Sequence, residues 1–163
     1  MILTVWGKPV QQGSKNFVGN TKSGRGIMVE QNKERLDPWR GEIIKACRQY
    51  QADNPDFVRY EGAVVARLIF CFDRPKSIRP KVRPYMSVAP DLDKLIRACL
   101  DGLTAGGAIK DDCQVVDFTR VAKVYCKEDP EALATPGAVI VLAALVPLEQ
   151  IQGGSPGQGG EGT

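Results

Sequence analysis

The segment "GAVVARLIFCF", residues 62–72, is the feature that most constrains the fold of this chain. It is almost continuously apolar, which is typical of a central strand that is covered on both faces. Asp73 and Pro75 follow it directly and are expected to end it. Such a strand needs neighbouring strands beside it and helices packed over it.

Other segments can supply those neighbours. Strands are expected for "MILTVWG", "CQVVDFTRVAKVYC" and "GAVIVLAAL", which are residues 1–7, 113–126 and 137–145. Apolar residues at helical spacing predict two helices. One starts with Asp37 as N-cap and Pro38 at its first position and runs to about Tyr50; the other follows Asp91 and stops at Gly106.

The predicted fold is therefore α/β (α+β): a small mixed β-sheet with two main helices packed on it, in a single domain over residues 1–147. Its 163 residues, 43% hydrophobic and 25% charged, are typical of one globular domain. The glycine-rich tail, residues 148–163, is expected to be disordered. No secretory signal is expected at Met1, and the apolar run 137–147 is too short to span a membrane.

Composition excludes several kinds of chemistry. The chain has no histidine, so Ser-His-Asp and Cys-His catalysis are ruled out. Its five cysteines form no CxxC pair, which makes a zinc site unexpected. Four of the cysteines lie in apolar runs, as expected for small buried residues in a reducing cytosol.

Positive charge is concentrated in two segments. Residues 11–28 contain Lys15, Lys22 and Arg25 without an acidic residue, and the glycines there predict a flexible loop. Residues 74–87 carry five cations and three prolines, also without an acid, and predict an extended exposed loop. Either loop could be merely solvated, or it could bind the phosphates of a nucleic acid.

Five aspartates surround the second predicted helix, in "VAPDLDKLIRACLDGLTAGGAIKDDCQ", residues 88–114. Folding explains each one separately: Asp91 caps the helix, Asp93 suits its dipole and pairs with Arg97, and Asp111–Asp112 form a turn. A single site explains them together, if the strand that follows packs beside the start of the helix and so brings their carboxylates to one point. Converging carboxylates require a cation, and Mg²⁺ is the natural one.

The segment "PDLDKLIRACLDGLTAGGAIKDDCQVVD", residues 90–117, resembles the signature of RusA-type Holliday-junction resolvases. The opening "VWGKPVQQGSK" and the basic "RPKSIRPKVRP" are similar to that family as well, and the likeness extends over residues 3–142. The resemblance implies a homodimer that binds four-way DNA junctions and nicks two strands symmetrically with Mg²⁺ or Mn²⁺. No small-molecule cofactor and no membrane are expected, and the location should be cytoplasmic, in a bacterial cell or a phage-infected host.

By motif position, the resemblance implies that Asp91, Asp93 and Asp112 are the catalytic metal ligands. The family asparagine after the second aspartate is Lys94 here, and the functional lysine of the family is Arg97. Arginine supplies charge but cannot donate a proton at neutral pH. The cations expected to contact DNA are Lys8, Lys15, Arg74, Lys76, Arg79, Lys81, Arg83, Lys94 and Lys110.

Two other functions remain open from the sequence. The two departures, Lys94 and Arg97, are compatible with a branched-DNA-binding protein whose catalysis is weak or lost. The aspartates could also be cap and turn residues of a domain that does not bind nucleic acid.

Overall fold

A computed structural model describes residues 1–13, 15–30 and 32–146 of the chain. The tail that was predicted to be disordered, residues 148–163, lies outside the described residues. The elements, in chain order, are β1 (Ile2–Trp6), β2 (Lys15–Asn20), β3 (Gly26–Glu30), α1 (Lys33–Asp53), β4 (Val64–Phe72), α2 (Leu92–Ala105), the short 3₁₀ helix η1 (Asp112–Gln114), β5 (Val115–Tyr125) and β6 (Gly137–Ala144).

The sheet that forms the body has four strands in the order β1-β6-β4-β5. β4 pairs antiparallel with β6 and parallel with β5, so the sheet is mixed, as the sequence predicts. A parallel pair requires a crossover connection, which residues 73–114 and α2 provide here. The parallel register places Val115 beside Val64 and Tyr125 beside Phe72, so β4 and β5 start at the same end of the sheet.

β4 is buried on both faces, which confirms the prediction for a central strand. Val64, Leu68 and Phe70 point into the core under the helices. Ile69 and Cys71 are fully buried as well but lie on the opposite face, because successive strand residues alternate. There the β5–β6 connection covers them, and the Leu133 N–H donates to the Cys71 sulfur over 3.2 Å.

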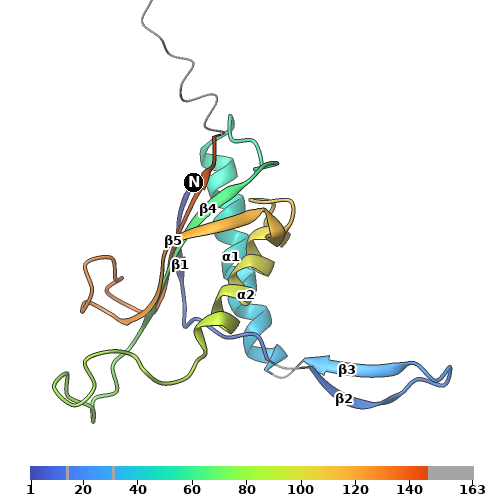
Figure 1. The fold of residues 1–163 in the computed structure, drawn as a ribbon, viewed down its shortest axis with the longest axis horizontal. Helices are drawn as coiled ribbons and strands as arrows, with labels where there is room; N and C mark the ends of the chain where they lie inside the picture. Colours follow the sequence, from blue (N-terminus) through green and yellow to red (C-terminus); the bar gives the residue numbers. More distant parts are fainter. Residues whose placement is uncertain (14, 31, 147–163) are drawn as a thin grey trace, which may run out of the picture.

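α1 and α2 lie side by side on the sheet (Figure 1) and contact each other closely. A Cβ atom added at Gly106 would lie 2.7 Å from the Cys47 Cβ, and one at Gly102 would lie 3.0 Å from Ile43. These glycines therefore set how near the helices approach. All five cysteines are free, and three of them are buried. Neither helix in the described part of the chain is long and apolar enough to cross a membrane.

Two local predictions are corrected by the structure. α1 begins at Lys33 rather than at Asp37, and Pro38 lies inside the helix. The Leu36 N–H donates to the Asn32 carbonyl, and the burial of the Leu36 side chain brings this extra turn into the helix. Residues 11–28, predicted to be a loop, contain most of the antiparallel β2–β3 hairpin, in which Phe17 pairs with Met28 across the turn.

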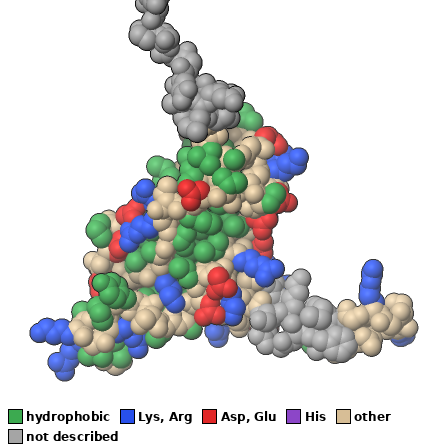
Figure 2. All heavy atoms as spheres, viewed as in Figure 1, with side chains coloured by type: hydrophobic (Ala, Val, Ile, Leu, Met, Phe, Trp, Pro, Cys, Tyr) green, Lys and Arg blue, Asp and Glu red, His purple; other side chains and the backbone are tan. Residues whose placement is uncertain are grey.

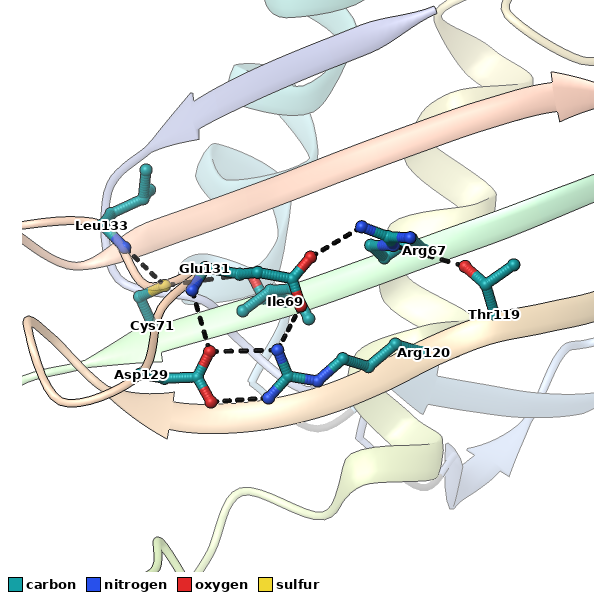
Figure 3. A network of polar contacts seen from close by, with 8 residues as sticks. All are labelled: Arg67, Ile69, Cys71, Thr119, Arg120, Asp129, Glu131 and Leu133. Atoms are coloured by element: carbon teal, nitrogen blue, oxygen red, sulfur yellow. Dashed lines mark hydrogen bonds and ion pairs between the residues drawn. The ribbon is translucent and has the colours of Figure 1, made fainter.

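A network of ion pairs holds the β5–β6 connection against the sheet (Figure 3). Arg120 on β5 donates to both oxygens of Asp129, over 3.0 and 2.5 Å. Glu131 accepts from Arg120 and, over 2.8 Å, from Arg67 on β4. The hydrogen bonds from Arg120 hold the pKa of Asp129 and the pKa of Glu131 below their usual values.

We predict that Arg120→Gln lowers the melting temperature by a few degrees at neutral pH, because the network loses its central cation. A carboxyl whose pKa is lowered by folding stabilises the native state above its unfolded pKa, and that contribution is lost as the pH falls through the lowered value. The difference between variant and wild type should therefore shrink in strong acid. Thermal unfolding followed by circular dichroism at several pH values tests this. Arg48→Gln, at an exposed α1 position, is the control; equal melting temperatures of wild type and Arg120→Gln at pH 7 would contradict the prediction.

Candidate active site

Two exposed carboxylates lie at the N-terminal end of α2. Asp91 is the N-cap residue and Asp93 lies in the first turn. The Asp91 side chain makes no capping hydrogen bond; its carboxylate instead contacts the Lys94 ammonium at 2.7 Å. The expected pair between Asp93 and Arg97 does not form, and neither side chain has an ion-pair partner among the described residues. Both Asp93 and Arg97 are exposed.

The backbone around Asp91 is held from two directions. The Gln11 side-chain oxygen accepts from the Asp91 N–H at 2.5 Å, and the Gln12 N–H donates to the Lys94 carbonyl at 3.1 Å. From β5, the Lys123 ammonium donates to the carbonyls of Val88 and Pro90, at 2.6 and 2.7 Å. Sequence reasoning missed Gln11 and Lys123, because their partners lie 80 and 33–35 residues away in the chain.

Positive charge keeps Asp91 ionised. The hydrogen bond from Lys94, and then the charge of Lys94, lower the pKa of Asp91, and Lys123 adds a smaller effect in the same direction. In return, the pKa of Lys94 is raised by Asp91 and, more weakly, by Asp93. At neutral pH the start of α2 therefore presents the Asp91 carboxylate paired with the Lys94 ammonium.

The second acidic pair lies after the other end of α2. Asp111 caps η1: its carboxylate accepts from the Cys113 N–H at 2.9 Å, and the Gln114 side chain accepts from the Asp111 N–H at 3.0 Å. Gln114 also donates to the carbonyls of Tyr60 and Gly62, which fixes this turn beside the start of β4. Asp111 thus has a folding role, whereas Asp112 is exposed and caps nothing.

The fifth aspartate has a structural partner. Asp101 accepts a hydrogen bond from the Arg40 guanidinium, which links α2 to α1. Its carboxylate is therefore explained by helix packing rather than by the candidate site.

The two acidic pairs do not converge within one chain. α2 has 14 residues, so its ends are about 21 Å apart. The sheet shows the same separation. Val115, just after η1, pairs with Val64 at the start of β4. Lys123, which contacts Pro90, pairs with Phe70 near the other end of that strand. Figure 1 shows the first turn of α2 and the turn into β5 at opposite ends of the helix. Among the described residues, no three acidic or cysteine side chains are grouped so that they could hold a metal ion.

The donors at the start of α2 still fit Mg²⁺. This ion binds proteins through one or two carboxylates and keeps waters or substrate phosphates as its other ligands. Asp91 and Asp93 supply two carboxylates, both exposed, on one turn. Asp112 of the same chain cannot join them.

The basic loop, residues 74–87, contains no helix or strand, as the sequence predicts. Arg74 closes the base of this loop instead of pointing into solvent. Its guanidinium contacts Glu128 at 2.5 Å, donates to the Arg83 carbonyl at 2.7 Å and lies 3.8 Å from the centre of the Tyr125 ring. The prediction of a DNA contact at Arg74 therefore gains no support from its surroundings.

The other predicted cations are placed as follows. Lys76, Arg79 and Lys81 are exposed on the loop, and Figure 2 shows blue side chains at its outer end. Lys8 is exposed near Pro90, and Lys110 is exposed beside Asp111. Lys15 lies on β2, and its side chain is outside the described part of the structure.

Comparison with known protein families finds a match that covers most of the chain. The model of the family "Endodeoxyribonuclease RusA" matches residues 7–133, which include both acidic pairs, both basic segments and the whole of α2. A search of curated proteins found no match. The matched part is well over half of the 163 residues. The chain therefore belongs to the RusA endodeoxyribonuclease family, and that membership implies Holliday-junction resolvase activity.

Proposed function

We propose that the protein is a metal-dependent endonuclease that binds four-way DNA junctions as a homodimer and resolves them by symmetric paired nicks. The observation that carries this proposal is the start of α2, where two exposed carboxylates lie next to an exposed basic loop. Carboxylates suit a metal ion and cations suit a phosphodiester, so the two together favour phosphate hydrolysis.

Asp91, Asp93 and Asp112 are the proposed ligands of Mg²⁺, with Mn²⁺ as a substitute. When bound, the ion supplies an activated water and charge stabilisation at the departing 3′ oxygen. Gln11 and Lys123 hold the backbone at and just before Asp91 in place.

A second copy of the chain would complete the ligand set. A twofold axis perpendicular to α2 near its midpoint exchanges the ends of the helix, which brings Asp112 of one copy beside Asp91 of the other. Symmetry makes both sites equal, as two symmetric nicks require. The side of α2 that such packing would cover carries Leu92, Ile96 and Leu100, spaced four residues apart and only half buried.

Two cations are suited to act on the phosphate. Arg97 is exposed and makes no ion pair with a described residue, so its guanidinium can face a phosphate oxygen and stabilise its charge. Lys94 contacts Asp91, which raises the pKa of Lys94 and makes proton release harder. A lysine ammonium can nevertheless give up a proton, whereas an arginine guanidinium cannot at neutral pH.

The second candidate function is a junction-binding protein with weak catalysis. The Asp91–Lys94 ion pair favours it, because Lys94 competes for a carboxylate that a metal ion would need. Both candidates predict binding to branched DNA that weakens with salt, and only the nuclease predicts nicks that depend on a divalent metal.

The first test is cleavage of a labelled four-way junction and of a matched linear duplex, each with Mg²⁺ and with EDTA. We expect paired nicks in the junction, only with the metal. Asp91→Asn and Asp112→Asn should abolish cleavage and leave junction binding as tight as in the wild type or tighter, because each removes a ligand and a negative charge. Asp56→Asn is the matched control, because Asp56 is exposed and makes no hydrogen bond or ion pair through its side chain with a described residue. Wild-type cutting by either site variant would refute the assignment, and binding without cutting by the wild type would favour the second candidate.

Alanine variants separate the roles of the two cations. If Lys94 takes over part of the role of the family lysine, Lys94→Ala should reduce the single-turnover cleavage rate at saturating protein. Arg97→Ala should also reduce that rate, through the loss of charge alone, so Arg97→Lys should restore it. The hypothesis for Lys94 is wrong if Arg97→Ala loses cleavage while Lys94→Ala cleaves at the wild-type rate.

A further inference from the structure

We propose that the cleft at the carboxyl ends of β4 and β5 binds one unstacked nucleobase of the DNA substrate, next to the scissile phosphate. The base that fits it carries an exocyclic amino group, as cytosine, adenine and guanine do and thymine does not. The inference rests on the proposed function and adds a specificity site to it.

The cleft lies where the parallel strand pair ends. Phe72 and Tyr125 are the last residues of β4 and β5, they pair with each other, and both line the cleft. The 74–87 loop and the β5–β6 connection leave the sheet at this end (Figure 1) and form its walls. In open α/β sheets, ligands bind in crevices outside the carboxyl ends of the strands. Pro90 also lines the cleft, which places it one residue from the proposed metal ligand Asp91.

The size and lining of the cleft suit a base better than a phosphate. Its volume is about 250 Å³, slightly below the range of about 300–1,000 Å³ that is typical for drug-sized ligands, so a single base is of suitable size. A phosphate would lose its hydration against apolar walls, whereas the flat faces of a base gain from contact with them. The apolar side chains of the walls include Phe72, Pro75, Met86, Val88, Pro90 and Pro136.

Three charged residues, Lys8, Asp73 and Arg83, also line the cleft. None of their side chains makes a hydrogen bond or an ion pair with a described residue. A carboxylate only accepts hydrogen bonds, so Asp73 would take an amino group of the base. Lys8 and Arg83 only donate, so they would take a ring nitrogen or a carbonyl oxygen beside it. Thymine has a carbonyl oxygen in place of the amino group, and the carboxylate would repel it.

Interactions within the chain hold the walls of the cleft in place. The Arg74 guanidinium lies 3.8 Å from the centre of the Tyr125 ring and donates to the Arg83 carbonyl at 2.7 Å, so it links the end of β5 to the loop. Lys123 on β5 donates to the Val88 carbonyl at 2.6 Å. A site that is formed before the ligand arrives costs little to order on binding.

The Tyr125 hydroxyl gives independent evidence for a ligand. It is buried and has no hydrogen-bond partner among the described residues, although Tyr125 lines the cleft. Buried hydroxyls in folded proteins are normally paired, so a partner is missing at this place. A polar atom on the edge of a bound base would supply it.

An exposed aromatic side chain lies on the same loop. Tyr85 stands between Arg83 and Met86, which both line the cleft, and it is 81% exposed. Stacking on an aromatic ring stabilises bases that have left the double helix. Unstacking costs least where pairing is already weak, which favours a base beside a branch point.

The test uses a four-way junction with 2-aminopurine, a fluorescent base with an exocyclic amino group, at each nucleotide around the branch point in turn. Binding is measured in EDTA to prevent cleavage. Because this base fluoresces more strongly when it is unstacked, we expect the wild type to raise its fluorescence on the order of twofold or more at one position. The same label farther along an arm should not respond.

Two variants assign the rise to the cleft. Asp73→Asn and Tyr125→Phe should keep the melting temperature of the wild type, because neither removes a side-chain hydrogen bond made to a described residue. Both should still bind the junction and lose most of the rise in fluorescence. Tyr50→Phe, the same change on α1 outside the cleft, is the matched control and should respond as the wild type does.

Single-turnover cleavage gives a second readout. Junctions that differ only in the base pair at the responding position should be cut on the order of tenfold faster with cytosine, adenine or guanine there than with thymine. Asp73→Asn should narrow this ratio, because its amide can also donate to thymine.

The inference is overturned if the wild type binds junctions without a rise at any position, or if both variants give the full rise. An equal preference among bases in the wild type and Asp73→Asn would overturn it as well. Failure of the proposed function looks different, because the wild type itself would then neither prefer nor cut junctions.

Discussion

The parallel pairing of β4 and β5 is the constraint on which the rest of the structure depends. It makes both strands start at one end of the sheet, so the connection between them must travel the full length of the body. α2 spans that length, and the turn after Gly106 leads into η1 and β5. Strand and helix therefore run in opposite directions, and each end of α2 lies beside a different end of β5. This places Lys123 next to the residues before Asp91, and Asp112 about one helix length away.

That separation is the chemical reason for the proposed dimer. A single chain offers the carboxylates of Asp91 and Asp93 at one end of α2 and that of Asp112 at the other, while Asp111 and Asp101 are occupied by folding contacts. In the proposed dimer, exchange of the helix ends by a twofold axis would combine Asp91 and Asp93 of one copy with Asp112 of the other, and it would do so twice. The same symmetry places the two reactions at related positions on a symmetric substrate. The remaining exposed surface of Leu92, Ile96 and Leu100, which are half buried against the core, would supply apolar area for the proposed packing.

The sequence was most informative where a pattern depends on nearby residues. The run of β4, the apolar face of α2 and the proline-rich 74–87 loop were all predicted, because burial and proline geometry act locally. The hairpin was missed because its glycines and cations resemble those of a loop, and the cross-strand pairing of Phe17 with Met28 is not visible in composition. The prediction that the aspartates converge within one chain was wrong for a related reason. Residue types show which groups are available, whereas the direction of β5 decides where those groups lie. The partners of Arg74 and Asp91, Glu128 and Gln11, are also too distant in sequence to be inferred.

Subunit mixing tests most directly whether the active site is shared between two chains. Asp91→Asn and Asp112→Asn protein, each inactive alone, are unfolded, mixed in equal amounts and refolded, and nicking of a four-way junction is measured. If the sites are shared, each mixed dimer contains one intact site. About a quarter of the wild-type number of active sites is then recovered, and each mixed dimer nicks one strand of the junction instead of two. A mixture of Asp91→Asn with Asp93→Asn should recover nothing, because every site then keeps one defect. Absence of recovery in the first mixture, with mixed dimers shown to be present, would contradict the account.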